Sequence, residues 1–473
     1  MSDSQIVLPT RDDPVAASAS EVVGGPAGRR VTSGSGWWTA VRVALAMTAV
    51  ACALGFLQKV PCRQDFFAEN VYPRLCYTDI APLYDGRGFA AGALPYVDTG
   101  DWEPLEYPVL TGAFMTLAAV LTQVVDTPGV PAYVRFFDVN VVLLAACALL
   151  GCWFVAGTHR HRPWDAVLLA PGIVLTAYIN WDLLAVALLA GALWAWARDR
   201  PVLTGVLLGL GTAAKLYPIL LLGPLLLLCL RGGRQHAFLR VLLGAAWTWL
   251  AVNLPLLLVA PDGWAAFYSF SRSRPAGFGS PWYALDQLGH PVPPAHLNLV
   301  AGGLFVLACA GIAVLAFAAP HRPRVAQLLF LVVAAFVLTN KVYSPQYVLW
   351  LVFLFPLARP RWRAYLVWLA FETVYFVAVW WYLQGLTNPG LEIPGWPHVW
   401  ATFLRMAATL VICALVIRDV WRPEHDPVRE VDPVTGALIV DDPGGGVLVG
   451  APDRWRLGGP GRSAAPIPLI KDG

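Results

Sequence analysis

Long apolar runs dominate this chain between residues 37 and 418, and only short polar stretches separate them. Hydrophobic residues make up 58% of the sequence and charged residues 13%, whereas a soluble globular chain carries about 25% charged residues. This composition excludes a water-soluble domain, and it is the opposite of what disorder over most of the length requires. We therefore expect an all-α polytopic membrane protein. The formal net charge of +3 gives no reason to expect a nucleic-acid partner.

Thirteen apolar runs are candidates for membrane-spanning helices, near residues 37–57, 107–125, 137–157, 166–179, 183–197, 202–214, 218–230, 238–260, 297–318, 325–339, 345–358, 363–385 and 398–418. Several have about 14 residues, although a straight span needs about 20. Short helices broken by Gly and Pro are tolerated where neighbours bury them or where they line a cavity. The pattern predicts a helical bundle in which the short helices are either buried by their neighbours or line a cavity.

Basic residues set the expected topology, because cytoplasmic loops carry an excess of Lys and Arg. Arg-rich segments occur at 159–162, 198–200, 231–234, 322–324, 359–363 and 418–422. Residues 1–36 are polar and contain no apolar core, so the first run is expected to be an uncleaved targeting signal. Thirteen crossings would place the two termini on opposite sides. We therefore expect about twelve crossings with both termini cytoplasmic, and one run among 107–125, 137–157 and 166–179 that does not cross.

The chain then divides into a disordered cytoplasmic tail (1–36), a polytopic domain (37–419) and a second disordered cytoplasmic tail (420–473), which is rich in Pro, Gly and Asp. Three segments face the extracytoplasmic side in this topology: a long first loop at 59–106, a loop at 261–296 and the connection 340–347. Cys62 and Cys76 share the first loop, where an oxidising exterior permits a disulfide. No His or Cys cluster has metal-ligand spacing, so we expect no bound metal.

Carboxylates in the first loop are the first candidates for catalysis. Asp79 stands between Thr78 and Ile80 in an apolar stretch, and desolvation there should raise its pKa toward the range of a general base. Asp85 precedes Gly86 and is typical of a turn. Glu106 abuts the membrane edge, where it is either a positioning residue or a cap for the following helix.

A second candidate lies between two short helices, at Asn180-Trp181-Asp182. Acidic and amide side chains at a membrane face suggest a functional site. Asp182 is equally well explained as the N-cap of the helix that follows it. The sequence leaves both interpretations open.

Cations at the same face are the third candidate. Only four of the 33 basic residues are Lys, and Lys215 and Lys341 both fall in extracytoplasmic connections. An intramembrane Lys is costly unless it is paired, and cations here would stabilise an anionic leaving group such as a lipid phosphate. Arg274 adds a guanidinium to this face. The alternatives for each Lys are snorkelling to the interface or an internal salt bridge with Asp79 or Asp182.

Five segments together resemble the C-type glycosyltransferase superfamily, and more closely glycosyltransferase family 87, over roughly residues 38–418. They are Cys76-Tyr77-Thr78-Asp79, Glu106-Tyr107-Pro108-Val109-Leu110-Thr111-Gly112, Asn180-Trp181-Asp182-Leu183-Leu184, Lys215-Leu216-Tyr217-Pro218 and Asn340-Lys341-Val342-Tyr343-Ser344-Pro345-Gln346-Tyr347. The family includes actinobacterial α-1,2-mannosyltransferases that use polyprenol-phosphate mannose. The resemblance implies a bacterial plasma-membrane enzyme whose active site faces the extracytoplasmic side.

The same resemblance assigns roles to residues. Asp79 falls at the catalytic position, as a general base in an inverting reaction. Lys215, Lys341 and Arg274 would bind the donor phosphate. The acceptor-binding or positioning residues would be Glu106, Tyr107, Asn180, Asp182, Tyr217 and Gln346. The donor would be a polyprenyl-phosphate sugar, with mannose favoured and arabinofuranose the nearest competitor, and the acceptor a glycolipid or a lipid-linked glycan. The second acidic residue that the superfamily often shows beside the base is missing here, which suits a reaction without metal or other cofactor.

Two other classes of protein fit part of the pattern. A multispan secondary transporter or lipid flippase would also have about twelve crossings, broken helices and intramembrane Lys and Asp residues. A structural subunit without chemistry would leave the extracytoplasmic grouping of Asp79, Lys215 and Lys341 unexplained.

Overall fold

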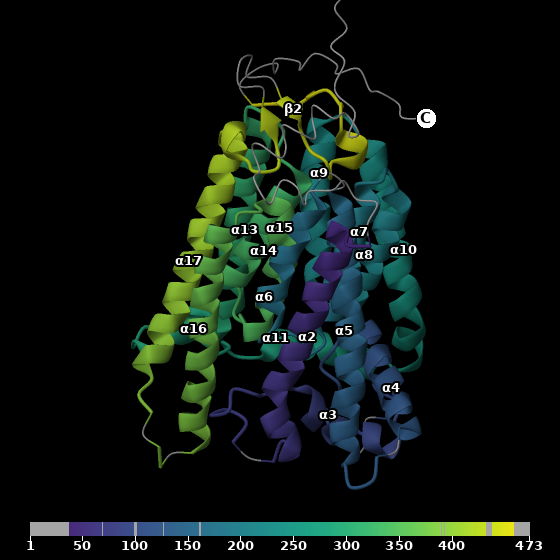
Figure 1. Cartoon of the computed structure of the whole chain (residues 1–473), viewed down its shortest axis with the longest axis vertical. Helices are drawn as coiled ribbons and strands as arrows, with labels where there is room; N and C mark the ends of the chain where they lie inside the picture. The colour runs from purple at the N-terminus through teal and green to yellow at the C-terminus, as the bar shows by residue number, and fades with distance from the viewer. Residues whose placement is uncertain are drawn as a thin grey trace, which may run out of the picture.

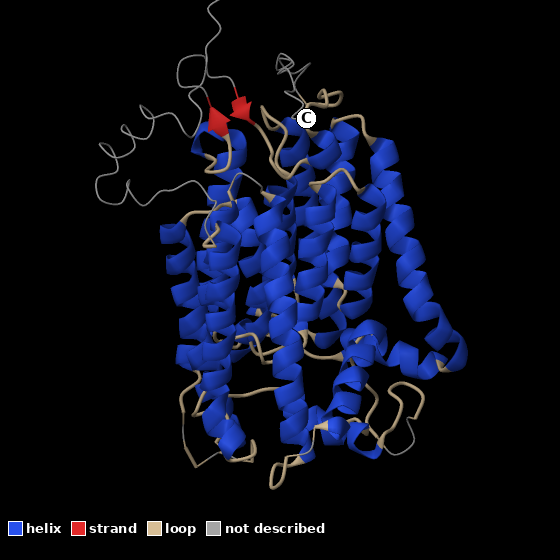
Figure 2. Cartoon of the chain, turned by 45° about the vertical axis from the view of Figure 1, so that its right-hand side comes forward, coloured by secondary structure: helices blue, strands red, loops and turns tan. Residues whose placement is uncertain are grey.

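The computed structural model describes residues 37–457 apart from 69, 99–101, 126, 160–161, 389, 392 and 432–437. The expected N-terminal tail 1–36 and the end of the chain from 458 lie outside the described residues. Within them the chain is a bundle of helices lying nearly parallel to one axis, with two short strands at one end (Figures 1 and 2). The strands β1 (Glu430–Val431) and β2 (Leu438–Val440) form an antiparallel pair.

Six of the described helices are long and apolar enough to cross a membrane. They are α2 (Ala40–Gln64), α5 (Ala132–Thr158), α10 (Gln235–Val259), α13 (Pro294–Ala318), α16 (Trp362–Thr387) and α17 (Trp396–Trp421). At about 1.5 Å per residue, each exceeds the ~30 Å hydrocarbon core of a bilayer. These helices form the frame that the expected membrane domain requires.

Shorter apolar helices pack between the long ones, as the sequence pattern predicts. They are α4 (Val109–Val124), α7 (Asp182–Trp196), α8 (Pro201–Ala214), α9 (Leu222–Arg231) with its preceding 3₁₀ helix Tyr217–Leu221, α14 (Val325–Thr339), and α15 (Val348–Ala358) with its preceding 3₁₀ helix Pro345–Tyr347. Figure 1 places α7, α8, α9, α14 and α15 in the upper half of the molecule and α4 in the lower part. The short helices of the upper half therefore end inside the bundle, part-way along the long helices.

The end of α8 shows how the sequence makes such a break. Proline lacks an N–H, and its ring clashes with the carbonyl four residues earlier, so Pro218 stops the helix at Ala214. Lys215 is then extended, with φ −159° and ψ 143°. The Ala214 carbonyl that the break frees accepts a hydrogen bond from Thr111 Oγ1 at 2.7 Å. The side chain of α4 thus satisfies the polar group that Pro218 exposes.

The remaining elements are short. They are α3 (Ile80–Gly86), α6 (Leu169–Ile173), α11 (Pro261–Ser273), α12 (Pro281–Gln287) and the 3₁₀ helices Phe89–Ala91, Pro163–Leu168, Pro423–His425 and Gly446–Leu448. The first loop is shorter than expected, because α2 continues through Pro61 to Gln64. The run 166–179 contains only a 3₁₀ helix, the five-residue α6 and turns, in keeping with Pro163 and Pro171-Gly172.

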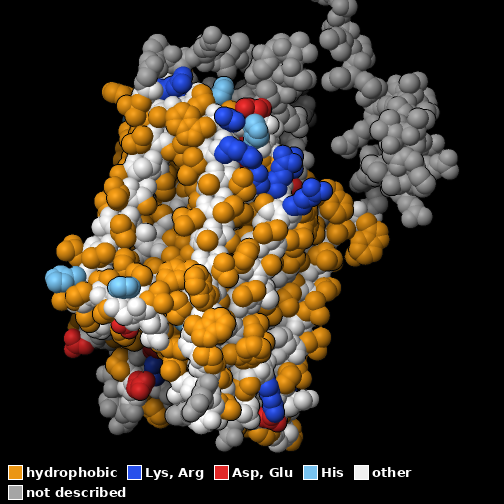
Figure 3. Space-filling model, turned by 90° about the vertical axis from the view of Figure 1, so that its left-hand side faces the viewer, with side chains coloured by type: hydrophobic (Ala, Val, Ile, Leu, Met, Phe, Trp, Pro, Cys, Tyr) orange, Lys and Arg blue, Asp and Glu red, His pale blue; other side chains and the backbone are white. Residues whose placement is uncertain are grey.

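The outer surface has the distribution of a membrane protein. Figure 3 shows hydrophobic side chains over the middle of the visible face, with Lys and Arg gathered toward one end. The Arg-rich segments meet at that end, where Arg231 and Arg322 both reach Asp453 and Arg359 reaches Asp419. The charge pattern from which the sequence predicts a single cytoplasmic face therefore corresponds to one end of the bundle.

The C-terminal segment corrects one expectation. Residues from 420 onward are predicted to be a disordered tail, yet the described part packs onto this end of the bundle. Asp426 forms a salt bridge with Arg324 in which Nε and Oδ2 are 2.8 Å apart and both side chains are fully buried. Gln327 Nε2 donates to the same carboxylate at 3.0 Å. The local composition of the tail gives no sign of partners about a hundred residues earlier, which is why sequence reasoning misses this packing.

Asp426→Asn should destabilise the protein strongly. It leaves the buried Arg324 guanidinium without the carboxylate of its ion pair, and breaking a buried pair in this way costs about 3–5 kcal/mol. Thermal unfolding of the detergent-solubilised protein measures the change. Glu424→Gln is the matched control, because Glu424 is exposed on the same segment, and it should leave the melting temperature unchanged. Equal melting temperatures for the two variants would contradict the prediction.

Candidate functional site

Asp79 lies where the first loop meets the inner ends of the short helices. Its backbone N–H donates to the carbonyl of Ile179 at 2.8 Å. The neighbouring Thr78 Oγ1 donates to the carbonyl of Tyr178 at 2.8 Å. The loop backbone is thus hydrogen-bonded to the turn that precedes α7. These bonds fix the carboxylate at the level of the broken helices rather than on a free loop.

The segment before Asp79 is also tied to α2. Cys62 and Cys76 form a disulfide with their Cα atoms 6.1 Å apart, which is the pairing expected from the sequence. Lys59 is almost fully buried, and its Nζ donates to the carbonyl of Tyr77 at 2.7 Å. Sequence reasoning misses Lys59, although the signal that singles out Lys215, a lysine within an apolar helix, was present there too.

A tyrosine contacts the Asp79 carboxylate directly. Tyr77 Oη donates to Asp79 Oδ1 at 2.6 Å. Burial raises the pKa of Asp79 above its usual value, although the Tyr77 hydrogen bond and the charge of Lys215 act in the opposite direction. Asp79 remains partly exposed. A reachable carboxyl with a raised pKa has the properties of a general base.

Lys215 and Asp182 form an ion pair at the inner ends of α8 and α7. Lys215 Nζ lies 2.7 Å from Asp182 Oδ1, which also accepts a hydrogen bond from Trp350 Nε1 at 2.6 Å. The Asp182 side chain is fully buried and that of Lys215 is 18% exposed. Of the alternatives left open by the sequence, the structure therefore contains the salt bridge with Asp182.

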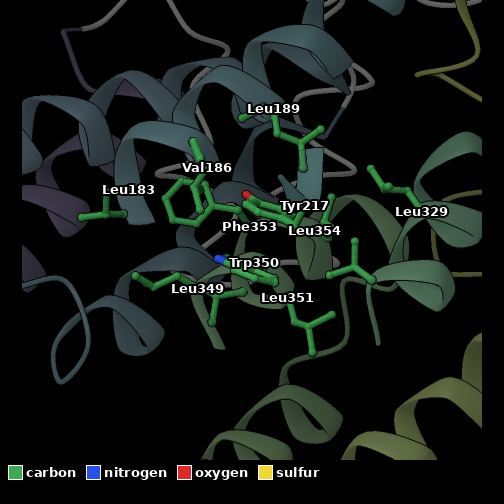
Figure 4. Packing of buried hydrophobic residues seen from close by; sticks show 14 of the residues in the cluster. Leu183, Val186, Leu189, Tyr217, Leu329, Leu349, Trp350, Leu351, Phe353 and Leu354 are labelled. Atoms are coloured by element: carbon green, nitrogen blue, oxygen red, sulfur yellow. The ribbon is translucent and has the colours of Figure 1, made fainter. Parts of the chain in front are cut away.

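Aromatic rings enclose this ion pair. Tyr217 and Tyr347 both stack on Trp350, and each ring centroid lies 4.0 Å from that of Trp350. Figure 4 shows Tyr217 and Trp350 lying against each other among buried leucines. Lys215 Nζ lies 5.1 Å from the centroid of the Tyr347 ring, within range of a cation–π interaction. The Lys215 ammonium is therefore held by both a carboxylate and an aromatic face.

The capping interpretation of Asp182 is not what the structure shows. Trp181 occupies the N-cap position of α7, and Asp182 is the first residue of the helix. The amide of Asn180 instead accepts the Asp182 N–H through Oδ1 at 3.2 Å. Asn180 is itself buried. It therefore holds the start of α7, and Asp182 is left to bind Lys215.

Glu106 and Tyr107 line the loop side of this region. Arg87 holds Glu106 through two hydrogen bonds, Nε to Oε2 at 2.8 Å and Nη2 to Oε1 at 2.9 Å. Tyr107 packs edge-on against Trp181 with ring centroids 5.2 Å apart. Both residues precede α4 and neither caps it, because Pro108 is the N-cap. The two hydrogen bonds from the Arg87 guanidinium position the Glu106 carboxylate. Sequence reasoning does not predict this contact.

Lys341 and Arg274 come from two different connections. Lys341 is buried, and its Nζ donates to the carbonyl of Arg272 at 2.8 Å. Burial lowers the pKa of Lys341, and the charge of Arg274 lowers it further. The Arg274 guanidinium lies over the Phe270 ring at 5.1 Å. The Arg274 guanidinium is therefore close enough to affect the Lys341 ammonium.

The connection that carries Lys341 and Gln346 is anchored by a buried arginine of α17. Arg405 Nη2 donates to the carbonyls of Gly279 at 2.8 Å and Tyr343 at 2.5 Å. Its guanidinium carbon lies 3.6 Å from the centroid of the Tyr343 ring. Gln346 is buried at the start of the following 3₁₀ helix. Arg405 thereby fixes the backbone of both cation-bearing connections.

Electrostatic coupling shows which candidates share one region. The charges of Lys215, Glu106 and Asp182 all act on Asp79. Burial raises the pKa of Tyr107, and the charges of Asp79, Glu106 and Asp182 raise it further. In the part of the chain that the structure describes, no three His, Cys, Asp or Glu side chains gather in a group that would hold a metal ion. The polar centre consists of carboxylates, lysines and tyrosines in an aromatic surround.

Comparison with protein-family models matches residues 105–345 to glycosyltransferase family 87. The chain belongs to this family. It is a membrane glycosyltransferase, and the resemblance inferred from its sequence motifs is confirmed. No curated protein matches the chain.

The family 87 match covers three of the five sequence motifs in full, with Glu106, Asp182 and Lys215, and the last one from Asn340 to Pro345, with Lys341. Gln346 lies just beyond the match. Asp79 and the disulfide precede the matched region. The assignment of Asp79 as a site residue therefore depends on its contacts in the structure and on the local sequence, and not on the family match.

Proposed function

We propose that this family 87 glycosyltransferase transfers mannose from polyprenyl-phosphate mannose to a glycolipid or lipid-linked glycan. The reaction takes place at the extracytoplasmic face and inverts the anomeric configuration. The observation that carries the proposal is the position of Asp79, a partly exposed carboxyl with a raised pKa that is coupled to Lys215 and Asp182 at the inner ends of the short helices.

The proposed mechanism uses this arrangement directly. Asp79 removes the proton from an acceptor hydroxyl as that oxygen forms a bond to the anomeric carbon. The bond between that carbon and the phosphate oxygen breaks, and polyprenyl phosphate leaves with the electron pair from the opposite face. Phosphate is a good leaving group, so no acid is needed on that side. We expect no metal or other cofactor.

The leaving phosphate needs positive charge. The charge of Arg274 lowers the pKa of Lys341, and the charges of Lys215 and Arg274 both affect the pKa of Tyr347. Cations that are already in place where charge develops stabilise the transition state without reorganisation. We therefore assign the donor phosphate to this group of cations. The residues assigned to acceptor binding or to positioning are Glu106, Tyr107, Asn180, Asp182, Tyr217 and Gln346.

Purified protein tests the proposal with a panel of polyprenyl-phosphate sugars and membrane-lipid acceptors, followed by mass spectrometry. We expect an acceptor mass increased by one hexose with the mannose donor and a slower or absent reaction with the arabinofuranose donor. A preference for the arabinofuranose donor would show that the proposed sugar is wrong, but it would leave the proposed mechanism unchanged. Movement of the donor across vesicle membranes without any transfer would favour the lipid flippase or transporter instead.

The proposed topology places the first loop outside and both termini inside. It is supported by the Arg residues that gather at the end where α17 terminates. Of the three runs from which one must not cross, α4 is the one in the lower part of the molecule (Figure 1). We therefore infer that α4 is the exception. The broken run 166–179 is counted as a crossing, because it leads from the Arg-rich segment 159–162 to Tyr178, whose carbonyl accepts a hydrogen bond from Thr78 of the first loop. About twelve crossings then leave both termini cytoplasmic.

Labelling of introduced cysteines in intact cells tests this topology. Val97→Cys in the first loop should react with a membrane-impermeant maleimide, because Val97 is 43% exposed. Glu424→Cys should react only after the cells are permeabilised. The unsubstituted protein, whose six free cysteines lie in apolar helices, gives the background. Labelling of position 424 but not 97 in intact cells would reverse the orientation and remove the basis of the mechanism.

A further inference from the structure

The aromatic residue before the proposed base is held more firmly than a loop residue requires. The Tyr77 ring lies 4.8 Å from the Trp380 ring and stacks on Tyr72 with centroids 5.5 Å apart and an interplanar angle of 11°. The disulfide at Cys76 and the Lys59 hydrogen bond fix the backbone on either side of this ring. A side chain that is restrained at its ring and at its backbone presents its hydroxyl in one place.

That hydroxyl reaches only one oxygen of the carboxylate. Tyr77 Oη donates to Asp79 Oδ1 at 2.6 Å, and no described residue forms a hydrogen bond to Oδ2. The charge of Asp79 raises the pKa of Tyr77, and burial raises it further, so this hydroxyl stays protonated and acts as a donor. One carboxylate oxygen is thus occupied and the other is free.

We propose that Tyr77 is a positioning residue for the reaction: its hydroxyl orients the Asp79 carboxylate so that Oδ2 receives the proton of the acceptor hydroxyl. This inference rests on the proposed function of Asp79. Because the donated hydrogen bond stabilises the ionised carboxylate, Tyr77 also keeps Asp79 competent as a base to lower pH than burial alone would permit. Tyr72 and Trp380 support the Tyr77 ring from the side. The hydroxyl can therefore orient the carboxylate without a charged partner of its own.

Other groups act on Asp79 and must be kept constant in any test. The titratable and charged residues whose charge is coupled to Asp79 are Lys59, Tyr72, Glu106, Tyr107, Asp182, Lys215 and Tyr347. Tyr77→Phe leaves all of them in place and preserves the stacked ring. Tyr72→Phe removes the hydroxyl of the neighbouring ring in the same stack, which makes it the matched control.

The experiment measures kcat/KM for glycosyl transfer against pH in the unsubstituted protein, Y77F and Y72F. Loss of a hydrogen bond to a charged group should raise the pKa of Asp79 in Y77F, which moves the acidic limb of the profile upward by about one to two pH units. The limb should stay in place in Y72F. An unchanged limb in Y77F, or an equal movement in Y72F, would overturn the proposal.

A second measurement does not depend on turnover. Carbodiimide modifies a protonated carboxyl, and peptide mass spectrometry reports labelling of Asp79 as a function of pH. The midpoint should move upward in Y77F and not in Y72F, even if Y77F transfers no sugar. Asp79→Asn, assayed in parallel, separates the two ideas. Retained transfer in that variant would remove the proposed base, whereas lost transfer with an unmoved Y77F midpoint would contradict only the role of Tyr77.

Discussion

Asp79→Asn should lower the rate of glycosyl transfer by about 10²–10⁴-fold, the range for loss of a general base. Asparagine keeps the size of the side chain and can still accept the Tyr77 hydrogen bond on its carbonyl oxygen, but it cannot take up a proton. Donor binding should persist, because Lys215, Lys341 and Arg274 are untouched. Transfer and binding of a polyprenyl-phosphate sugar are measured on the same preparation.

Asp85→Asn is the matched control for this prediction. Asp85 lies six residues further along the same loop, near the end of α3, and its side chain is exposed. The variant should transfer sugar at a near-normal rate. Selective loss in Asp85→Asn would move the base to that residue. Loss of donor binding together with transfer in Asp79→Asn would make Asp79 a substrate-binding residue instead.

The membrane frame could be read from sequence because lipid imposes a simple rule. Runs at 238–260, 297–318, 363–385 and 398–418 correspond to α10, α13, α16 and α17, each with ends displaced by only a few residues. Backbone groups in lipid must be satisfied within the segment, so apolar run and helix coincide. The run 166–179 fails this rule because Pro171 and Gly172 interrupt it and neighbours bury it.

Contacts between distant segments were not readable in the same way. The sequence indicates that Asp182, Lys215 and Asp79 belong to one face, but the pairing of Lys215 with Asp182 depends on how α7 and α8 meet. Arg87 and Glu106 are 19 residues apart with a 3₁₀ helix between them. The packing of the C-terminal segment is not predictable from local sequence for the same reason, since Asp426 meets Arg324 only once the bundle is assembled.

The ion pair with Asp182 allows two different roles for Lys215. If Lys215 only neutralises Asp182, its role is structural, whereas if it also stabilises the leaving phosphate, its charge is needed for transfer. Lys215→Met alone cannot separate these roles. It leaves the fully buried Asp182 unpaired, which costs about 3–5 kcal/mol of stability, and any loss of activity could follow from that.

The double variant Lys215→Met/Asp182→Asn separates the two roles. Asparagine removes the unpaired charge and still accepts the Trp350 hydrogen bond, so the melting temperature should return to near that of the unsubstituted protein. We expect kcat/KM to remain lower by about 2–4 kcal/mol, the size of a single electrostatic stabiliser, which is about 30- to 900-fold.

Lys341→Met provides the comparison, because Lys341 Nζ donates to the Arg272 carbonyl and its loss leaves no carboxylate unpaired. This variant should lose transfer over the same range with little change in melting temperature. Recovery of normal transfer by the double variant would assign Lys215 to stability alone. The phosphate would then be left to Lys341 and Arg274, which lie on two connections fixed by Arg405.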